Sequence, residues 1–385
     1  MHGNVERLPI RSLPSRPASL PARSSELPAT PGPVERVAVL LNANARSVTE
    51  RLRRDLENFV PPEDLFFSRS FDDARRIART VLDRGYRTVL TGGGDGTFVG
   101  YVNLMYAEAE ARQAFSSSGG AALRTAPVRV ALPRVGVLKL GTGNSLAGFS
   151  GASSRRVGVV EDILRAQSGE ITASRPLHLL SHEGKRAPFA GMGIDAAVLN
   201  DYVSVKENLA GTRLQFAATG GLGYFCAVVG KTIPTVLAQR SAPNVEVLNL
   251  GGLAWQLGQG GLPVGRQIEH GEILYRGPCR LAAAGTVPCY GYGLQIFPHA
   301  LRSPGRFQLR LTAMGVPRIL GNLRKIWKGQ TPRTGLFDFS CTKVQITFDR
   351  DMPLQVGGDA EGYRKQLVLE MADEPIELLD FAARG

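Results

Sequence analysis

The sequence predicts an α/β fold in which an N-terminal parallel-sheet domain precedes a β-rich domain of antiparallel, sandwich-like form. In the first half, apolar runs typical of buried strands alternate with amphipathic helical segments, as in a parallel sheet. Two of those runs pass directly into glycine-rich loops. From about Leu177 onward, short strand-like runs are separated by turns at the spacing of an antiparallel sandwich.

The first predicted elements form a strand–helix–strand unit. Order is expected to begin near Val34, and the run Val37–Leu41 is apolar enough for a buried strand. The amphipathic segment Val48–Phe59 follows as a helix, and Leu65–Phe67 is the second strand. Ser68 comes at the C-terminal end of that strand, where parallel sheets bind their ligands.

A second helix and a third strand continue the alternation. Asp72 and Asp73 suit the positive N-terminus of a helix, which is expected to end before Gly85. The β-branched run Arg87–Leu90 is the strand that follows. The sequence therefore predicts a βαβαβ order, with ligands at the carboxyl edge of the sheet.

The first glycine-rich loop lies between this strand and a helix expected from Phe98 to about Arg112. Backbone N–H groups converge at such a junction, glycines allow close approach, and the helix dipole favours an anion such as phosphate. Asp95 would be repelled by a phosphate unless it holds a metal or accepts a proton, which favours chemistry on a phosphate over an ordinary glycine turn. The expected ligand-contacting residues are Gly92, Gly93, Gly94, Asp95, Gly96 and Thr97.

A second loop of the same kind follows the predicted strand Val135–Leu140. It consists of Gly141, Thr142, Gly143, Asn144 and Ser145. Parallel strands end at one edge of a sheet, so the two loops are expected to lie together. Neither loop contains the Gly-Lys-Ser/Thr of a P-loop, and the first lacks the third glycine of a dinucleotide fingerprint.

Together the two loops resemble those of the diacylglycerol kinase catalytic family, which includes sphingosine kinases and bacterial lipid kinases. The family's Gly-Gly-Asp-Gly-Thr loop matches Gly93–Thr97, and its Leu-Gly-Thr-Gly-Asn loop matches Leu140–Asn144. The resemblance implies an ATP-binding α/β domain, a β-rich lipid domain and a cleft between them. It also implies phosphorylation of a hydroxyl of diacylglycerol or a related sphingoid-type lipid by ATP with Mg²⁺.

Further matches extend the resemblance over roughly residues 34–381. Asn42 and Ser68 fall where the family contacts the nucleotide. Phe189–Ala196 matches a glycine-rich segment of the family. Gln355–Glu361 resembles its late Asp-Gly-Glu motif, stretched here to Gly-Gly-Asp-Ala-Glu.

The resemblance implies three catalytic carboxylates, on Asp95, Asp359 and Glu361. Glu361 is the expected base for the proton of the acceptor hydroxyl, but the stretched motif leaves open that Asp359 takes this role. Asp95 is expected either to hold the magnesium that travels with ATP or to act as the base. Without the resemblance, Asp359 and Glu361 would be interpreted as a solvated turn.

Two departures from the family pattern concern metal ions. Ser145 replaces the aspartate that often follows the second loop in bacterial members. Ser303-Pro304-Gly305 stands where the family has a carboxylate for a structural magnesium. A structural magnesium site is therefore expected to be absent, whereas the magnesium of ATP is still expected.

The net charge of +12 indicates an acidic partner. The interval 302–333 has no Asp or Glu and eight basic residues: Arg302, Arg306, Arg310, Arg318, Arg324, Lys325, Lys328 and Arg333. Within it, Pro317–Gly329 predicts a basic amphipathic helix with an interfacial Trp, suited to an anionic membrane. Alternatively, its apolar face packs on the sheet. Nucleic acid is not an expected partner, because no recognition motif accompanies the arginines.

The expected domains are residues 34–170 and 171–385, with a closing strand at Glu374–Leu379 that returns to the first domain. The proline-rich tail 1–33 lacks core residues and is expected to be disordered. No apolar run is long enough to span a membrane, and four widely spaced cysteines favour reduced thiols. These features predict a cytoplasmic protein associated peripherally with a membrane.

Two other functions remain open from the sequence. An NAD kinase-like enzyme would share the first glycine loop, although the second loop and the late acidic motif argue against it. A nucleotide- or lipid-binding protein that has lost catalysis would explain the missing acidic positions. The oligomeric state is undetermined, and a homodimer is left open.

Overall fold

The structure is a computed structural model in which the chain beyond Val34 forms one compact unit. It describes residues 36–45, 47–118, 130–141, 144–197, 242–290, 293–330 and 334–383. The tail predicted to be disordered lies outside the described residues, as do Thr142 and Gly143 of the second loop.

The N-terminal half is built on a six-stranded sheet with the order β2-β1-β3-β4-β18-β5. Its strands are β1 (Val37–Asn42), β2 (Leu65–Ser68), β3 (Thr88–Gly93), β4 (Arg134–Lys139), β5 (Ser174–Leu177) and β18 (Ile376–Leu379). All neighbours are parallel except β18 and β5. β1 and β3 are apolar and almost wholly buried, as central strands covered on both faces must be.

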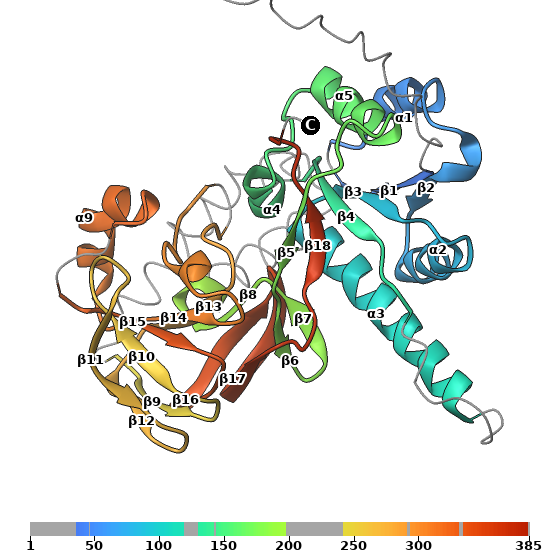
Figure 1. Ribbon diagram of the computed structural model, residues 1–385. Coiled ribbons are helices and arrows are strands. Elements are labelled where there is room, and N and C mark those ends of the chain that lie inside the picture. Colours follow the sequence, from blue (N-terminus) through green and yellow to red (C-terminus); the bar gives the residue numbers. More distant parts are fainter. Residues whose placement is uncertain are drawn as a thin grey trace, which may run out of the picture. The chain divides into compact units, whose positions relative to one another are not determined.

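Helices cover both faces of this sheet, with α1 and α5 above it and α2 and α3 below it in Figure 1. They are α1 (Glu50–Glu57), α2 (Phe71–Asp83), α3 (Asp95–Ser118), α4 (Ser145–Phe149) and α5 (Arg156–Gln167), with the short η1 (Pro62–Asp64). Leu40 of β1 packs in one cluster with Ile77 of α2. Leu41 belongs to another cluster, which includes Leu52 of α1. Successive residues of the strand therefore pack on opposite faces of the sheet.

The predicted βαβαβ order is confirmed, and the differences lie at element ends. β3 continues through Gly92 and Gly93 instead of stopping at Leu90, and α3 begins at Asp95 rather than Phe98. Almost no free loop therefore remains between strand and helix. α3 also runs to Ser118, past the expected end near Arg112.

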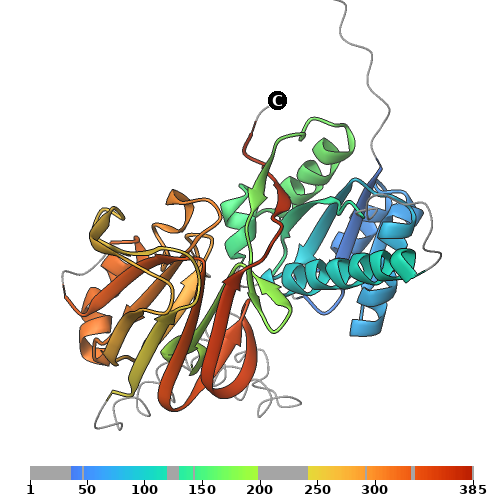
Figure 2. The same ribbon diagram turned by 60° about the horizontal axis from the view of Figure 1, so that its bottom comes forward.

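The C-terminal half is a twelve-stranded sheet in which every pairing is antiparallel. Its strands are β6 (Leu180–His182), β7 (Lys185–Ala187), β8 (Phe189–Gly193), β9 (Asn244–Asn249), β10 (Ala254–Leu257), β11 (Pro263–Ile268), β12 (Ile273–Pro278), β13 (Leu281–Gly285), β14 (Phe307–Thr312), β15 (Leu336–Cys341), β16 (Lys343–Val356) and β17 (Asp359–Met371). The long hairpin of β16 and β17 is drawn in red tones in Figure 2. The predicted fold class is thus confirmed.

In the described part of this half, η3 (Ala300–Arg302) and α9 (Val316–Trp327) lie outside the sheet's ladder. The last strand, β18, leaves the antiparallel sheet and pairs with β4 and β5 in the parallel one. The two predicted domain boundaries remain a prediction. Among the described residues, no helix has the length and apolar character needed to cross a bilayer.

One predicted surface charge is internal. Arg310 of β14 is only 1% exposed and pairs with Asp338 of β15, which is 2% exposed, at 2.7 Å. A buried cation needs such a partner because an unpaired one would be strongly destabilising. Arg310 therefore does not contribute to the basic surface expected from residues 302–333.

Candidate active site

The two glycine loops touch each other through their main chains. β3 and β4 are adjacent and parallel, with Gly93 opposite Lys139. A Cβ atom added to Gly141 would lie 2.1 Å from Cα of Gly94, closer than any real side chain allows. Only glycine permits this approach, so the first residue of the second loop is fixed by the position of the first loop.

Asp95 ties the loops together. It is the first residue of α3, and its carboxylate accepts hydrogen bonds from the backbone N–H groups of Ser145 (2.9 Å) and Leu146 (3.1 Å). These are N–H groups of the first turn of α4, where a negative charge is favourable. In this arrangement Asp95 positions the second loop. Its predicted roles toward magnesium or as a base remain predictions.

The other predicted nucleotide contacts have structural partners around the first loop. Asn42 donates from Nδ2 to Oγ1 of Thr97 at 3.1 Å, which links the end of β1 to the loop. Cβ atoms on Gly92 and Gly93 would lie 2.2 Å from Leu41 Cδ2 and 2.3 Å from Thr97 Oγ1. A side chain at either glycine would therefore displace a neighbouring side chain. Ser68 is buried at 6% exposure at the end of β2.

Asn144 closes the second loop. Its side chain accepts from the N–H of Gly141 at 2.9 Å and donates to the carbonyl oxygen of the same residue at 2.5 Å. Its φ of 51° lies in the left-handed region, which asparagine tolerates better than most residues. Next to it, the hydroxyl of Ser145 is buried and has no hydrogen-bond partner among the described residues.

The antiparallel sheet brings the late acidic motif to the first glycine loop. Asp359 is the first residue of β17, and its Oδ1 would lie 3.2 Å from a Cβ atom on Gly96. The turn before it contains Gly357, where a Cβ would lie 2.9 Å from Val99 Cγ2 in the first turns of α3. Asp359 therefore lies beside Gly96, the residue after Asp95, although 264 sequence positions separate Asp95 from Asp359.

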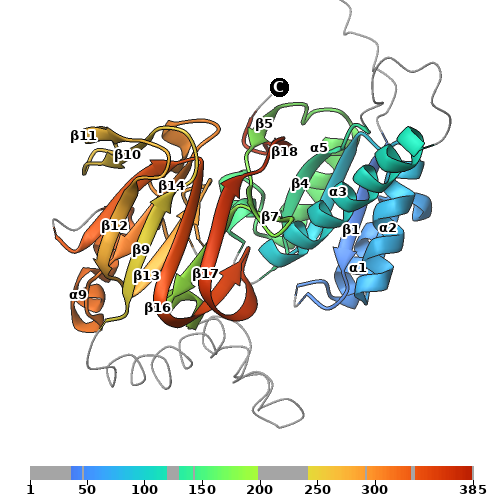
Figure 3. The ribbon, with the colours of Figure 1, turned by 90° about the horizontal axis from the view of Figure 1, so that it is seen from below.

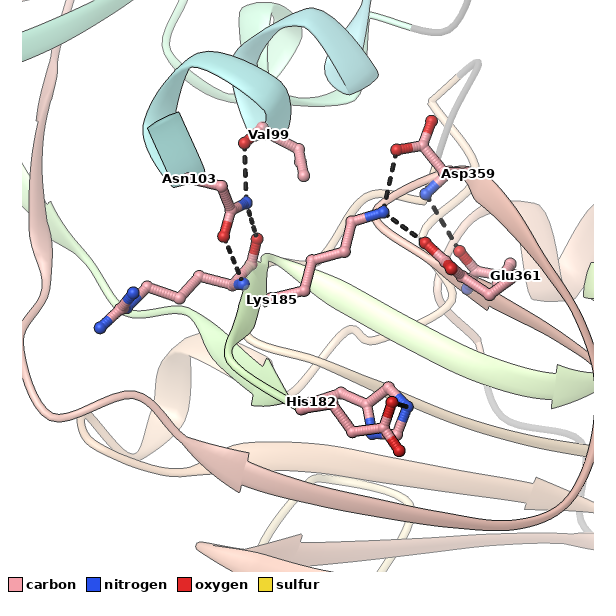
Figure 4. Close-up of polar contacts among 10 residues, drawn as sticks. Val99, Asn103, His182, Lys185, Asp359 and Glu361 are labelled. Atoms are coloured by element: carbon pink, nitrogen blue, oxygen red, sulfur yellow. Dashed lines mark hydrogen bonds and ion pairs between the residues drawn. The ribbon is translucent and has the colours of Figure 1, made fainter. Parts of the chain in front are cut away.

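Lys185 joins this cluster and was not predicted. Its Nζ lies 3.1 Å from Oδ2 of Asp359 and 2.5 Å from Oε1 of Glu361, between the two carboxylates (Figure 4). It belongs to the short strand β7, in a hairpin without any recognisable motif. No sequence signal short of the tertiary structure pairs it with residues some 170 positions away.

The comparisons with known proteins agree with this geometry. The family model of the diacylglycerol kinase catalytic domain matches residues 36–175, which include both glycine loops. Residues 36–175 are therefore similar in sequence to that catalytic domain. No curated protein matches the chain.

Solved structures extend the likeness in fold beyond this kinase domain. A diacylglycerol kinase from Bacillus anthracis str. Sterne aligns over 90% of this chain and 97% of its own, with a TM-score of 0.55 and 12% identity. A second crystal structure from the same organism covers 91% and 98%, with a TM-score of 0.56 and 14% identity. An NAD kinase from Archaeoglobus fulgidus in complex with ATP aligns at a TM-score of 0.40, too weakly to bear on function.

Behind the acidic turn lies a buried chain of hydrogen-bonded polar groups. Gln355 accepts from the N–H of Gly358 at 3.0 Å and donates to Oδ2 of Asp195 at 3.3 Å. The hydroxyl of Tyr290 donates to the same carboxylate. Asp195 is buried, and this desolvation raises the pKa of its carboxyl group despite these hydrogen bonds. These hydrogen bonds fix the turn that carries Asp359.

A magnesium ion bound together with phosphate groups would need a carboxylate at these loops. Among the described residues, no group of three or more His, Cys, Asp or Glu side chains could hold a metal by itself. Mg²⁺ commonly uses one or two carboxylates together with phosphate oxygens, and Asp95 is the carboxylate between the loops. Bound there, the ion would neutralise negative charge on the phosphates.

Proposed function

We propose that the protein is an ATP-dependent lipid kinase that phosphorylates a hydroxyl group of diacylglycerol or a related sphingoid-type lipid. The observation that carries the proposal is the approach of Asp359 to Gly96, which sets an acidic pair against a phosphate-binding type of loop. The family of the kinase domain supports ATP as the phosphate donor and a lipid alcohol as the acceptor.

In this proposal, ATP lies across the two loops. The N-terminus of α3 offers backbone N–H groups and a positive dipole end to its phosphates. Asn42 and Asn144 keep the loops in shape through their bonds to Thr97 and Gly141.

The proposed reaction is an in-line displacement at the γ-phosphorus. The oxygen of the lipid hydroxyl forms the new bond to phosphorus, while the bond to the β–γ bridging oxygen breaks and ADP leaves with its electron pair. Glu361 accepts the proton of the hydroxyl group. Asp359, nearer to Gly96, faces the phosphates and keeps the alternative role of base.

We also propose that α9 docks on an anionic membrane surface. Trp327 is 42% exposed, and the basic side chains of Arg318, Arg324, Lys325 and Lys328 are exposed as well. Each basic residue near such a surface contributes on the order of 1 kcal/mol to binding. Ile326 is buried, so part of the helix packs on the protein and the rest is available to lipid.

A lipid panel tests the proposed substrate class. Purified protein is incubated with ATP labelled on the γ-phosphate and either diacylglycerol micelles, sphingoid-base micelles or NAD. The proposal predicts label in a lipid product and none in NAD. Label only in NAD would establish the rival kinase activity. Nucleotide binding without any transfer would indicate a protein that has lost catalysis.

A further inference from the structure

The carboxylate of Asp359 lies between the ammonium group of Lys185 and the first glycine loop. This ammonium group contacts Asp359 Oδ2 at 3.1 Å, and the other oxygen of that carboxylate would lie 3.2 Å from a Cβ on Gly96. The lysine side chain is 31% exposed, so it borders both the protein interior and the space in front of the loop. A phosphate held by the loop would lie within reach of the lysine ammonium group.

The strand that carries Lys185 is attached to the helix that starts at the loop. The side-chain amide of Asn103 on α3 donates to the carbonyl oxygen of Arg186 and accepts from its N–H, both at 2.8 Å. Figure 3 shows β7 against α3, and Figure 4 shows the amide pairing. Because α3 begins with Asp95, this pairing fixes the base of the lysine side chain relative to the glycine loop.

The charge of Lys185 is secured by its partners. Burial alone would lower its pKa, but the hydrogen bond to Glu361 and the charge of Asp359 raise it above the ordinary value of 10.5. The side chain is therefore a cation at neutral pH and offsets one of the two negative charges beside it. Without it, two carboxylates would repel the terminal phosphate of ATP.

We propose that Lys185 binds the γ-phosphate of ATP. In the free protein its ammonium group forms ion pairs with Asp359 and Glu361. When ATP binds, the flexible side chain rotates so that the ammonium group contacts the terminal phosphate. A cation at the transferring phosphoryl group stabilises the transition state. The same movement frees Glu361 to accept the hydroxyl proton. The inference rests on the proposed ATP site but not on the identity of the acceptor.

Calorimetric titration with ADP and with a non-hydrolysable ATP analogue tests this contact. ADP lacks the γ-phosphate. The ratio of the affinity for the analogue to the affinity for ADP therefore measures the contribution of the γ-phosphate to binding. The wild type is expected to favour the analogue by about tenfold, as for one charge-assisted hydrogen bond. Lys185→Met should bring the ratio close to one, and Lys185→Arg should largely restore it.

A matched control is Lys343→Met, which removes a lysine paired with Glu370 at 2.6 Å on the hairpin of β16 and β17. It should leave the ratio unchanged. If Lys185→Met fails to fold, Lys185→Gln replaces it. A wild-type ratio in the folded Lys185 variants, or no preference for the analogue in the wild type, would overturn the inference. In one outcome the wild type prefers the analogue over ADP, and Lys185→Met loses this preference, while the protein phosphorylates no lipid. That result would refute the proposed function and still support the role of Lys185.

Discussion

The buried carboxyl group of Asp195 should make stability depend on pH. Burial raises its pKa above the ordinary value of 3.8, so the folded protein binds this proton more tightly than the unfolded chain. The stabilisation is complete below that ordinary value and is lost as the pH rises through the folded-state pKa. Asp195→Asn keeps an acceptor for Tyr290 and cannot ionise.

As the pH rises from the ordinary value of 3.8 through the folded-state pKa, the Asn variant should therefore lose less free energy of unfolding than the wild type. Urea denaturation at a series of pH values measures this difference. Equal losses in both proteins would show that Asp195 does not ionise differently on folding.

Residues on short motifs were predictable, and residues that support them were not. Asp95, Asp359 and Glu361 belong to glycine-rich patterns that stand out in the sequence, and the structure places Asp359 beside Gly96. Lys185 has no such pattern, because its role arises from partners far along the chain. Gln355 begins the late motif, but that motif does not reveal its hydrogen bond to Asp195. Arg310 was assigned to the surface because the sequence cannot show its pairing with Asp338.

At the level of elements, the contact between the two glycine loops can be tested at Gly141. A methyl group there would collide with the main chain of Gly94, which cannot move aside as a side chain could. Gly141→Ala should lower the free energy of unfolding by about 1–3 kcal/mol and weaken ATP binding. Gly148→Ala in α4 is the control, because a Cβ atom there meets nothing within 4 Å. Equal effects of both changes would contradict the close contact.

The proposed docking of α9 predicts a loss of liposome binding on charge reversal. Changing Arg324, Lys325 and Lys328 to Glu removes three positive charges and adds three negative ones, so sedimentation with anionic vesicles should fall at least tenfold. The control reverses Arg350, Arg364 and Lys365, which are exposed on β16 and β17. If the control reduces binding as much, net charge and not α9 governs the attraction.

Element prediction succeeded where strands are buried on both faces and failed where they are exposed. β1 is an almost continuous apolar run, and β3 begins with the β-branched and apolar residues Thr88, Val89 and Leu90, so their sequences are distinctive. β11 (Pro263–Ile268) is exposed along nearly its whole length and contains proline and glycine, so no apolar alternation marks it. The pairing that makes it a strand is supplied by β10.

For the whole molecule, Asn103 is the clearest link between the two sheets. Its amide makes two hydrogen bonds to the backbone of Arg186, and replacing it would leave both backbone groups without these partners. Asn103→Ala should lower the free energy of unfolding by about 2–4 kcal/mol and reduce phosphoryl transfer. Asn322→Ala is the control, since that amide bonds only within α9. Denaturant titration measures both, and equal small losses would mean that the link is unimportant.

The central claim is that a carboxylate from the antiparallel sheet takes part in phosphoryl transfer at loops of the parallel sheet. The most direct test compares the wild type and Glu361→Gln for transfer of labelled phosphate from ATP to diacylglycerol. We expect the variant to bind ATP normally and to lose at least about a hundredfold in kcat, as for a missing general base. Undiminished transfer by both Glu361→Gln and Asp359→Asn would contradict the account.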